Sequence, residues 1–189
     1  MASTLEALLF STSVVALAEM GDKTQLLSFV LAAKLKRRGP IILGILVATL
    51  ANHFLAGSLG VWLARLVAPE TLRWIVTLSF FAFALWALKP DSLDGERALP
   101  ATGVFVATLI AFFIVEMGDK TQLATIALAA RYDALVAVVL GTTLGMMIAN
   151  VPAVWLGEAL MQRVSMAAMR WVAAALFVVL GLLALWVPG

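Results

Sequence analysis

Long apolar stretches separated by short polar segments run along the whole chain. A helix needs about 20 apolar residues to cross a bilayer, and the runs 39–64 and 134–157, which contain no Asp, Glu, Lys or Arg, exceed that length. The apolar stretches are 5–33, 39–64, 74–88, 101–130, 134–157 and 171–187. This pattern predicts six transmembrane helices joined by short connections.

The composition supports this prediction. The chain has 189 residues, of which 63% are hydrophobic and 13% are charged, and its mean hydropathy is +1.06. A soluble domain is nearer half apolar and a quarter charged, so an ordinary globular fold and a disordered chain are both excluded. There is no cysteine, so disulfides and thiolate metal sites are excluded as well.

The two halves of the chain are copies of each other. The octapeptide EMGDKTQL occurs at residues 19–26 and again at 116–123, an offset of 97 residues that also relates Gly44 to Gly141. We interpret this as the duplication of a three-helix unit. The predicted organisation is a first repeat at 1–88, a polar cytoplasmic linker at 89–100 and a second repeat at 101–189.

An odd number of helices per repeat makes the second copy enter the membrane from the opposite side. The predicted fold class is therefore an all-α integral membrane protein built from two inverted three-helix repeats. The loops after the first, third and fifth spans hold eight basic residues: Lys34, Lys36, Arg37, Arg38, Lys89, Arg97, Arg163 and Arg170. The other two loops hold three: Arg65, Arg73 and Arg131. Because basic loops stay in the cytoplasm, both termini are predicted to be non-cytoplasmic.

Each motif copy places two acids and a lysine near the middle of a long apolar stretch. A charge at the bilayer centre costs a few kcal/mol even on the mildest scale. If the helix is continuous, Glu19, Asp22 and Lys23 share one face, because residues three and four apart are neighbours. We predict that this face and its counterpart in the second repeat meet at the membrane midplane.

The acids of the two motifs predict a cation site. Four carboxylates and two ammonium groups carry a net charge of −2, which one divalent cation would neutralise. Oxygen ligands suit hard ions such as Mn²⁺, Ca²⁺ and Mg²⁺. The predicted metal ligands are Glu19, Asp22, Glu116 and Asp119. The predicted supporting residues are Gly21, Lys23, Thr24, Gln25, Gly118, Lys120, Thr121 and Gln122.

Other motif residues leave alternatives open. The two glycines could let backbones approach closely, or let the helix unwind locally and expose carbonyl groups to an ion. Met20 and Met117 are either further ligands, which would favour Mn²⁺ over Ca²⁺, or packing residues. The motif lysines are either counter-ions of the acids or surrogate cations that take the place of the metal. A purely structural alternative pairs each lysine with the glutamate of its own motif.

The second span of each half adds polar candidates. Asn52 and Asn150 could supply oxygen ligands or form hydrogen bonds between helices, and their offset of 98 departs from the repeat. His53 is the single histidine, and we assign it a structural role. Glycines in these spans are predicted to allow close helix packing: Gly57, Gly60, Gly141 and Gly145.

The duplicated E-x-G-D-[KR]-[TS] motif, in a six-span protein with a hydrophilic central loop, resembles the GDT-type cation exchanger family. That family was formerly uncharacterised protein family 0016, of the cation/Ca²⁺ exchanger group. The resemblance covers essentially the whole chain and implies export of Mn²⁺, with Ca²⁺ as the alternative, in exchange for protons. It also implies a bacterial inner-membrane protein. It marks Glu19, Gly21, Asp22, Lys23 and Thr24, and Glu116, Gly118, Asp119, Lys120 and Thr121.

Two other function classes remain as alternatives: a passive divalent cation channel and an intramembrane aspartyl protease using Asp22 and Asp119. The first would share the acidic site, and the second would share a proton between two aspartates. The expected partners are the lipid bilayer and the transported ion, with protons as counter-ion, no resident cofactor and no nucleic acid. The oligomeric state is left open, since one chain suffices for the site.

Overall fold

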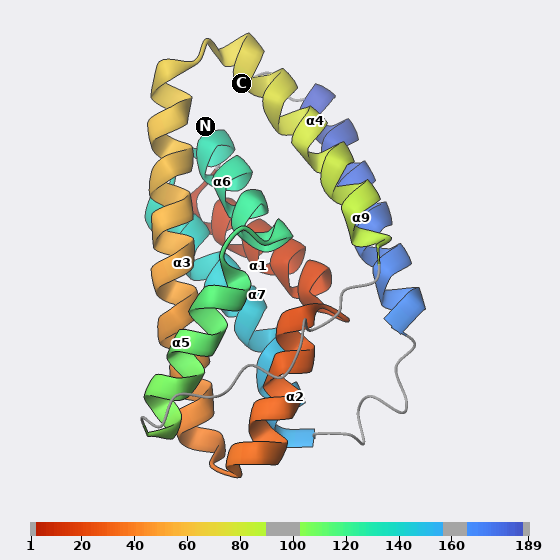
Figure 1. Cartoon of the computed structure of the whole chain (residues 1–189). Helices are drawn as coiled ribbons and strands as arrows, with labels where there is room; N and C mark the ends of the chain where they lie inside the picture. Colours follow the sequence, from red (N-terminus) through yellow and green to blue (C-terminus); the bar gives the residue numbers. More distant parts are fainter. Residues whose placement is uncertain (1–2, 90–102, 157–165, 187–189) are drawn as a thin grey trace.

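The computed structural model describes residues 3–89, 103–156 and 166–186, and over these residues the chain is entirely helical or connecting loop, without strands (Figure 1). The helices are α1 (Thr4–Glu19), α2 (Lys23–Leu35), α3 (Arg38–Leu66), α4 (Pro69–Ala87), α5 (Val104–Glu116), α6 (Lys120–Tyr132), α7 (Leu135–Leu156) and α9 (Met166–Trp186). The all-helical fold class is confirmed. Residues 90–100 of the linker, and Arg97 and Arg163 of the orientation argument, lie outside the described residues.

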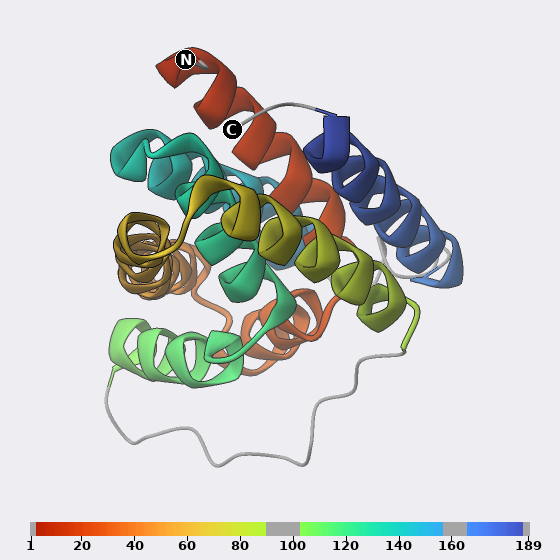
Figure 2. The same cartoon turned by 90° about the horizontal axis from the view of Figure 1, so that it is seen from above.

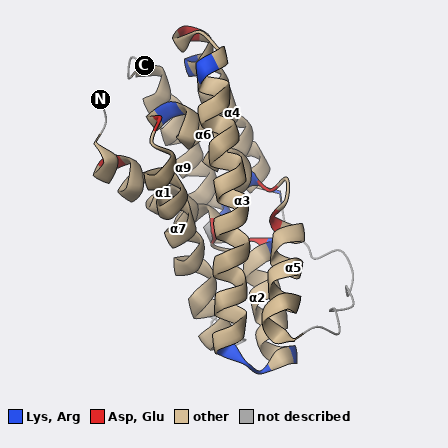
Figure 3. Ribbon diagram, turned by 90° about the vertical axis from the view of Figure 1, so that its left-hand side faces the viewer, with Lys and Arg blue, Asp and Glu red and all other residues tan. Residues whose placement is uncertain are grey.

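Several of these helices are long and apolar enough to cross a membrane. α3, α4 and α7 qualify individually, and α1 and α2 qualify as one span bent by 70°, which gives up to four candidate spans among the described residues. Val104–Glu116 and Arg170–Trp186 are shorter apolar helices. Lys and Arg gather at the ends of the bundle, while a small group of both charges lies near its middle (Figure 3). The chain is therefore a multi-pass membrane protein.

Both motif copies interrupt a helix. α1 ends at Glu19 and α2 begins at Lys23, while α5 ends at Glu116 and α6 begins at Lys120. The glycine inside each break has a left-handed backbone, with φ +86° at Gly21 and +75° at Gly118, a conformation that glycine adopts without steric cost. The expected local unwinding is confirmed. The expectation that each motif lies on one face of a continuous helix is wrong, because the residues between the acids are not helical.

The helices of the two halves pack on each other rather than only on their neighbours in sequence. α1 packs along α7 and α5 along α3, while α4 and α9 run side by side (Figure 2). Gly141 touches the Leu8 carbonyl and Ser11, and Gly44 touches the Phe105 carbonyl and Thr108. These two sets of contacts are related by the offset of 97 residues. The two halves therefore use equivalent surfaces against each other.

The glycine-packing prediction is confirmed at all four positions. A Cβ at Gly141 would lie 2.5 Å from the Leu8 oxygen, and one at Gly145 would lie 2.6 Å from the Thr12 oxygen. Gly57 and Gly60 lie equally close to neighbouring helices, against Leu135 and the Ile126 carbonyl. Backbones this close leave no room for lipid or water between α7 and α1, or between α3 and α6.

Candidate functional site

The two helix breaks meet inside the bundle, and each ends in a buried aspartate. Asp22 directly precedes α2, and Asp119 directly precedes α6, both with extended backbone. This is the position from which an aspartate commonly caps its own helix, yet neither side chain makes a capping hydrogen bond. Both carboxylates are instead engaged in contacts that connect the two halves of the chain.

Three carboxylates gather at this point. Glu19, Asp22 and Asp119 each offer an oxygen atom, and these three oxygens lie within 4.8 Å of one another. All three residues are buried. Carboxylates removed from water and placed together repel one another, so they require a compensating positive charge. The site thus combines one acid pair from the first motif with one aspartate from the second.

The positive charge comes from the motif lysines, and each lysine contacts a carboxylate of the other motif copy. Lys23 Nζ lies 2.9 Å from Asp119 Oδ1, and Lys120 Nζ donates a hydrogen bond to Asp22 Oδ1. Each lysine thus contacts the aspartate of the other motif, a contact that the structural alternative did not predict. The two ion pairs differ in depth, because the Lys23 side chain is 23% exposed and the Lys120 side chain 4%.

Glu19 is held by Thr24, the second residue of the helix on the other side of the break. The Thr24 hydroxyl donates a hydrogen bond to Glu19 Oε2. Among the described residues no hydrogen-bond partner reaches Glu19 Oε1. Glu19 also interacts electrostatically with Asp119, Lys120 and Glu116. This buried oxygen of Glu19 therefore remains available to a ligand at the centre of the site.

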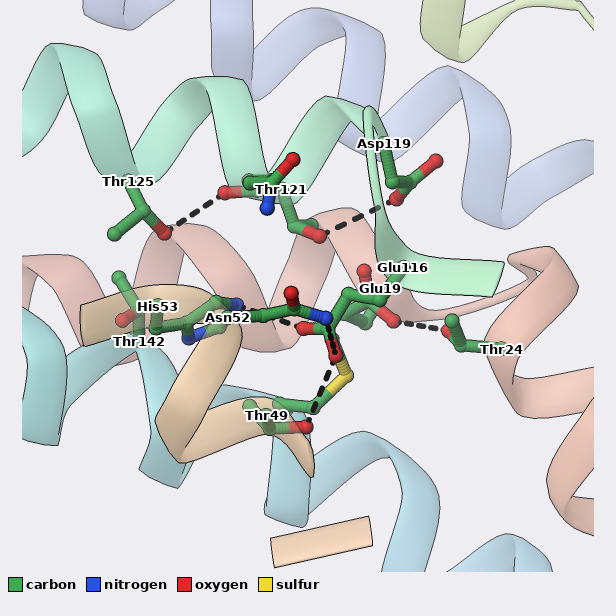
Figure 4. A network of polar contacts seen from close by, with 12 residues as sticks. Glu19, Thr24, Thr49, Asn52, His53, Glu116, Asp119, Thr121, Thr125 and Thr142 are labelled. Atoms are coloured by element: carbon green, nitrogen blue, oxygen red, sulfur yellow. Dashed lines mark hydrogen bonds and ion pairs between the residues drawn. The ribbon is translucent and has the colours of Figure 1, made fainter. Parts of the chain in front are cut away.

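Glu116 has different surroundings from Glu19, although the motif around it is identical. It is not one of the three gathered carboxylates and lies against polar residues of α3 (Figure 4). His53 Nε2 lies 2.9 Å from Glu116 Oε1, and Asn52 Nδ2 donates to Glu116 Oε2 at 3.3 Å. Thr49 Oγ1 donates to the same oxygen at 3.4 Å. The four predicted ligands therefore divide into a group of three and a separately held fourth.

Thr49 was not among the predicted site residues, and His53 was predicted to be structural, without a contact to the motif. Nothing in the sequence distinguishes Thr49 from the other hydroxyl residues of the apolar spans. His53 carries a signal that could have been used, since it is the one ionisable side chain in the otherwise charge-free run 39–64. A titratable group in the middle of a membrane span is costly and therefore suggests a polar partner.

The motif glutamines stabilise the two helix breaks in the same way. The Gly21 N–H donates to Gln25 Oε1 at 3.0 Å, and the Gly118 N–H donates to Gln122 Oε1 at 2.7 Å. Gln25 Nε2 also donates to the Ala149 carbonyl at 3.1 Å. These amide oxygens, predicted as support for the cation, accept hydrogen bonds from the backbone of the break.

The remaining candidates lie around the three carboxylates without joining them. Asn150 Oδ1 accepts a hydrogen bond from Ser28 at 2.7 Å, which links α7 to α2. Thr121 Oγ1 donates to Asp119 Oδ2 at 3.3 Å. Met117 is 51% exposed, whereas Met20 is partly buried. Asn150 thus makes the hydrogen bond between helices that was one of its two predicted roles.

A helical membrane protein with buried carboxylates at two helix breaks is of the class that moves cations across a bilayer. The chain belongs to the family of divalent cation/proton antiporters GDT1, whose family model matches residues 7–95 and 104–188. The family is one of transporters, so the protein is a transporter and not an enzyme, which removes the protease alternative. The resemblance predicted from the duplicated motif is confirmed.

Relatives cover nearly the whole chain. A protein of Vibrio cholerae named "Putative manganese exporter" is 49% identical over 179 residues, which span 94% of this chain and 90% of that protein. GDT1-like protein 5 of Arabidopsis thaliana is 27% identical over 227 residues, spanning 100% of this chain and 99% of the plant protein. GDT1-like protein 3 of Oryza sativa subsp. japonica is 27% identical over 202 residues, or 91% of this chain and 71% of that protein. No solved structure matches the chain.

Proposed function

We propose that this protein exports Mn²⁺ across the inner membrane in exchange for protons, and that Glu19, Asp22 and Asp119 bind the ion. The observation that carries the proposal is the meeting of these three buried carboxylates from both motif copies within 4.8 Å. Three carboxylates bind a hard divalent ion better than a monovalent one, because both the charge and the oxygen ligands fit.

The choice of Mn²⁺ over Ca²⁺ is supported by the relative of 49% identity, whose printed name is that of a manganese exporter. The site also offers few ligands. Ca²⁺ takes six to eight oxygens, whereas three carboxylates that offer one oxygen each suit an ion with fewer protein ligands and retained waters. Glu116 is kept outside this ligand set, since α3 holds it through His53, Asn52 and Thr49.

The transport pathway that we propose is formed by six spans in two inverted repeats. α1 with α2, and α5 with α6, would each form one broken span, with the site at the two breaks. The equivalent positive-φ glycines and the equivalent contacts of Gly44 and Gly141 support this arrangement. The charges of the loops support non-cytoplasmic termini, with the 89–100 linker on the cytoplasmic side.

Exchange with protons follows from the chemistry of the proposed ligands. A carboxylate binds either a metal ion or a proton, but it does not bind both at one oxygen. Protons that enter from one side would therefore displace the cation toward that side. A carrier of this kind moves one ion against the other without any resident cofactor.

The experiment is transport by the full-length protein in proteoliposomes. Mn²⁺ flux is followed together with internal pH, in wild type and in Glu19→Gln and Asp119→Asn. The matched controls are Glu6→Gln, an exposed acid on α1, and Asp133→Asn, an exposed residue after α6 at φ +46°, where asparagine is also tolerated. We expect the site variants to lose at least about 90% of the flux and the controls to keep it, since one lost charged ligand costs a factor of ten or more.

Two results would contradict the proposal. Mn²⁺ flux without proton counterflow would favour the channel alternative. Undiminished exchange in both site variants would remove the three carboxylates from the transport site. Replacing Mn²⁺ by Ca²⁺ in the same liposomes tests the choice of ion.

A further inference from the structure

The two motif lysines place ammonium groups on two of the three gathered carboxylates. Lys23 contacts Asp119 at 2.9 Å, and Lys120 contacts Asp22. A cation that binds the aspartate oxygens must therefore share them with these ammonium groups or displace them. The two lysines differ in how freely they can leave their aspartates.

Lys120 is enclosed. Its side chain is 4% exposed, its partner Asp22 is fully buried, and it also interacts electrostatically with Glu19. Breaking this pair would separate a buried ammonium group from a buried carboxylate, which is strongly destabilising. Lys120 is therefore positioned as a permanent counter-ion of the site.

Lys23 can leave its partner at much lower cost. Its side chain is 23% exposed, and it stands at the first residue of α2, directly after the break. A lysine side chain has a flexible four-carbon stem, so its ammonium group can move away from Asp119 while the backbone stays in place. The carboxylate of Asp119 would then need a new cation.

The charges of the site support a division of roles. With the three carboxylates ionised and both lysines in contact, the net charge is −3 + 2 = −1. When Lys23 withdraws and Lys120 stays, the net charge is −3 + 1 = −2, which matches a divalent ion. A monovalent ion that replaced Lys23 would restore only the charge that the ammonium group already supplied.

We propose that Lys23 is a tethered competitor of the transported cation at Asp119, and that Lys120 is a fixed counter-ion at Asp22. Lys23 thereby selects for divalent over monovalent ions. The inference rests on the proposed function, since it assigns a selectivity role within the same cation site. It adds to that function a difference between two residues that are identical in the two motif copies.

The test is equilibrium binding of Mn²⁺ to the purified full-length protein, at fixed pH and ionic strength. The variants are Lys23→Met, Lys23→Arg and Lys120→Met, with Lys34→Met as a control that removes an exposed charge from the same helix. Lys23→Met is expected to lower the Mn²⁺ Kd about tenfold, because one charge-assisted contact no longer competes. Lys23→Arg, which keeps the charge, and Lys34→Met are expected to bind as wild type does.

Selectivity supplies a second readout. When Na⁺ replaces choline at constant ionic strength, the Mn²⁺ Kd of Lys23→Met is expected to rise at least about threefold, and that of wild type to stay constant. Lys120→Met is expected to bind Mn²⁺ no more tightly than wild type and to unfold at a lower temperature, since Asp22 loses its buried partner.

Several outcomes would overturn the inference while leaving the proposed function standing. These are a Lys23→Met Kd equal to or above that of wild type, equal tightening in Lys23→Met and Lys23→Arg, and equal tightening in Lys23→Met and Lys120→Met. If wild type itself binds no Mn²⁺, the proposed function fails, and the inference fails with it.

Discussion

The helix break of the second motif allows a direct test of its left-handed backbone conformation at Gly118. Gly118 has φ +75°, and a Cβ added there would meet no atom within 4 Å. Gly118→Ala therefore changes the conformational energy of the backbone without creating a steric clash with the rest of the protein. Substitutions at the packed glycines would combine both effects.

The expected magnitude follows from that φ value. A residue with a Cβ in the left-handed region costs roughly 1–2 kcal/mol relative to glycine. This lowers the ratio of folded to unfolded protein about 5- to 30-fold. Asparagine tolerates the left-handed region better than alanine, so Gly118→Asn is expected to recover part of the loss. Because Asp119 follows this residue, the break is also expected to move in Gly118→Ala and to weaken Mn²⁺ exchange.

The assay is the unfolding transition of the purified protein in detergent, paired with exchange in proteoliposomes. The control is Gly39→Ala, because Gly39 also has open space around a Cβ and lies in α3 without a positive φ. There alanine gains helix propensity over glycine but has a Cβ directly before Pro40, so the change in stability is expected to stay within about 1 kcal/mol. If Gly118→Ala proves as stable as Gly39→Ala, and Gly118→Asn offers no advantage over it, the left-handed break is refuted.

Two further substitutions test the packing and the surroundings of the fourth acid. His53→Ala removes the side chain that lies 2.9 Å from the buried Glu116 carboxylate. It is expected to lower the free energy of unfolding by about 2–3 kcal/mol in the same assay, and His53→Gln is expected to recover part of the loss. An alanine variant as stable as wild type would show that this contact does not stabilise the protein. Gly141→Ala places a Cβ 2.5 Å from the Leu8 oxygen. It is expected to lower the free energy of unfolding by about 1–3 kcal/mol, because α1 and α7 must move apart. A stability equal to that of Gly39→Ala would contradict the close packing of these two helices.

Much of the fold follows from the order of apolar and polar residues. The runs 39–64 and 134–157 predicted the long helices α3 and α7, because no charge interrupts them. The predicted count of six spans is not confirmed by the described helices. The described helices supply three candidate spans, or four with the bent pair, since the motif divides the first and fourth stretches into segments shorter than a span.

The sequence predicts which residue types form the site, but not which of the four acids lie together. Identical octapeptides predict identical surroundings, yet Glu19 and Glu116 differ because the surroundings come from the other half of the chain. The repeat offset of 97 places Met146, Ala149 and Asn150 on α7 where α3 has Thr49, Asn52 and His53. Aligning Asn52 with Asn150 by residue type concealed this difference, since His53 is the position that corresponds to Asn150.

The contact of each lysine with the aspartate of the other motif could not be predicted for a related reason. A pattern within one motif relates Lys23 to Glu19, four residues away, and that relation holds only on a continuous helix. Once Gly21 turns the chain by way of a positive φ, the lysine begins a new helix with a different direction. Its contact with Asp119 then depends on how the halves assemble, which no local pattern encodes.

The unequal surroundings of the two glutamates have an evolutionary consequence. A three-helix ancestor that worked as a pair of separate, identical chains would have carried every side chain twice, so a histidine beside one glutamate would also have stood beside the other. Joining two copies in one gene removed that constraint. The single histidine at position 53 and the asparagine at position 150 are a difference that two identical chains could not carry, and it gives two acids of common origin different surroundings.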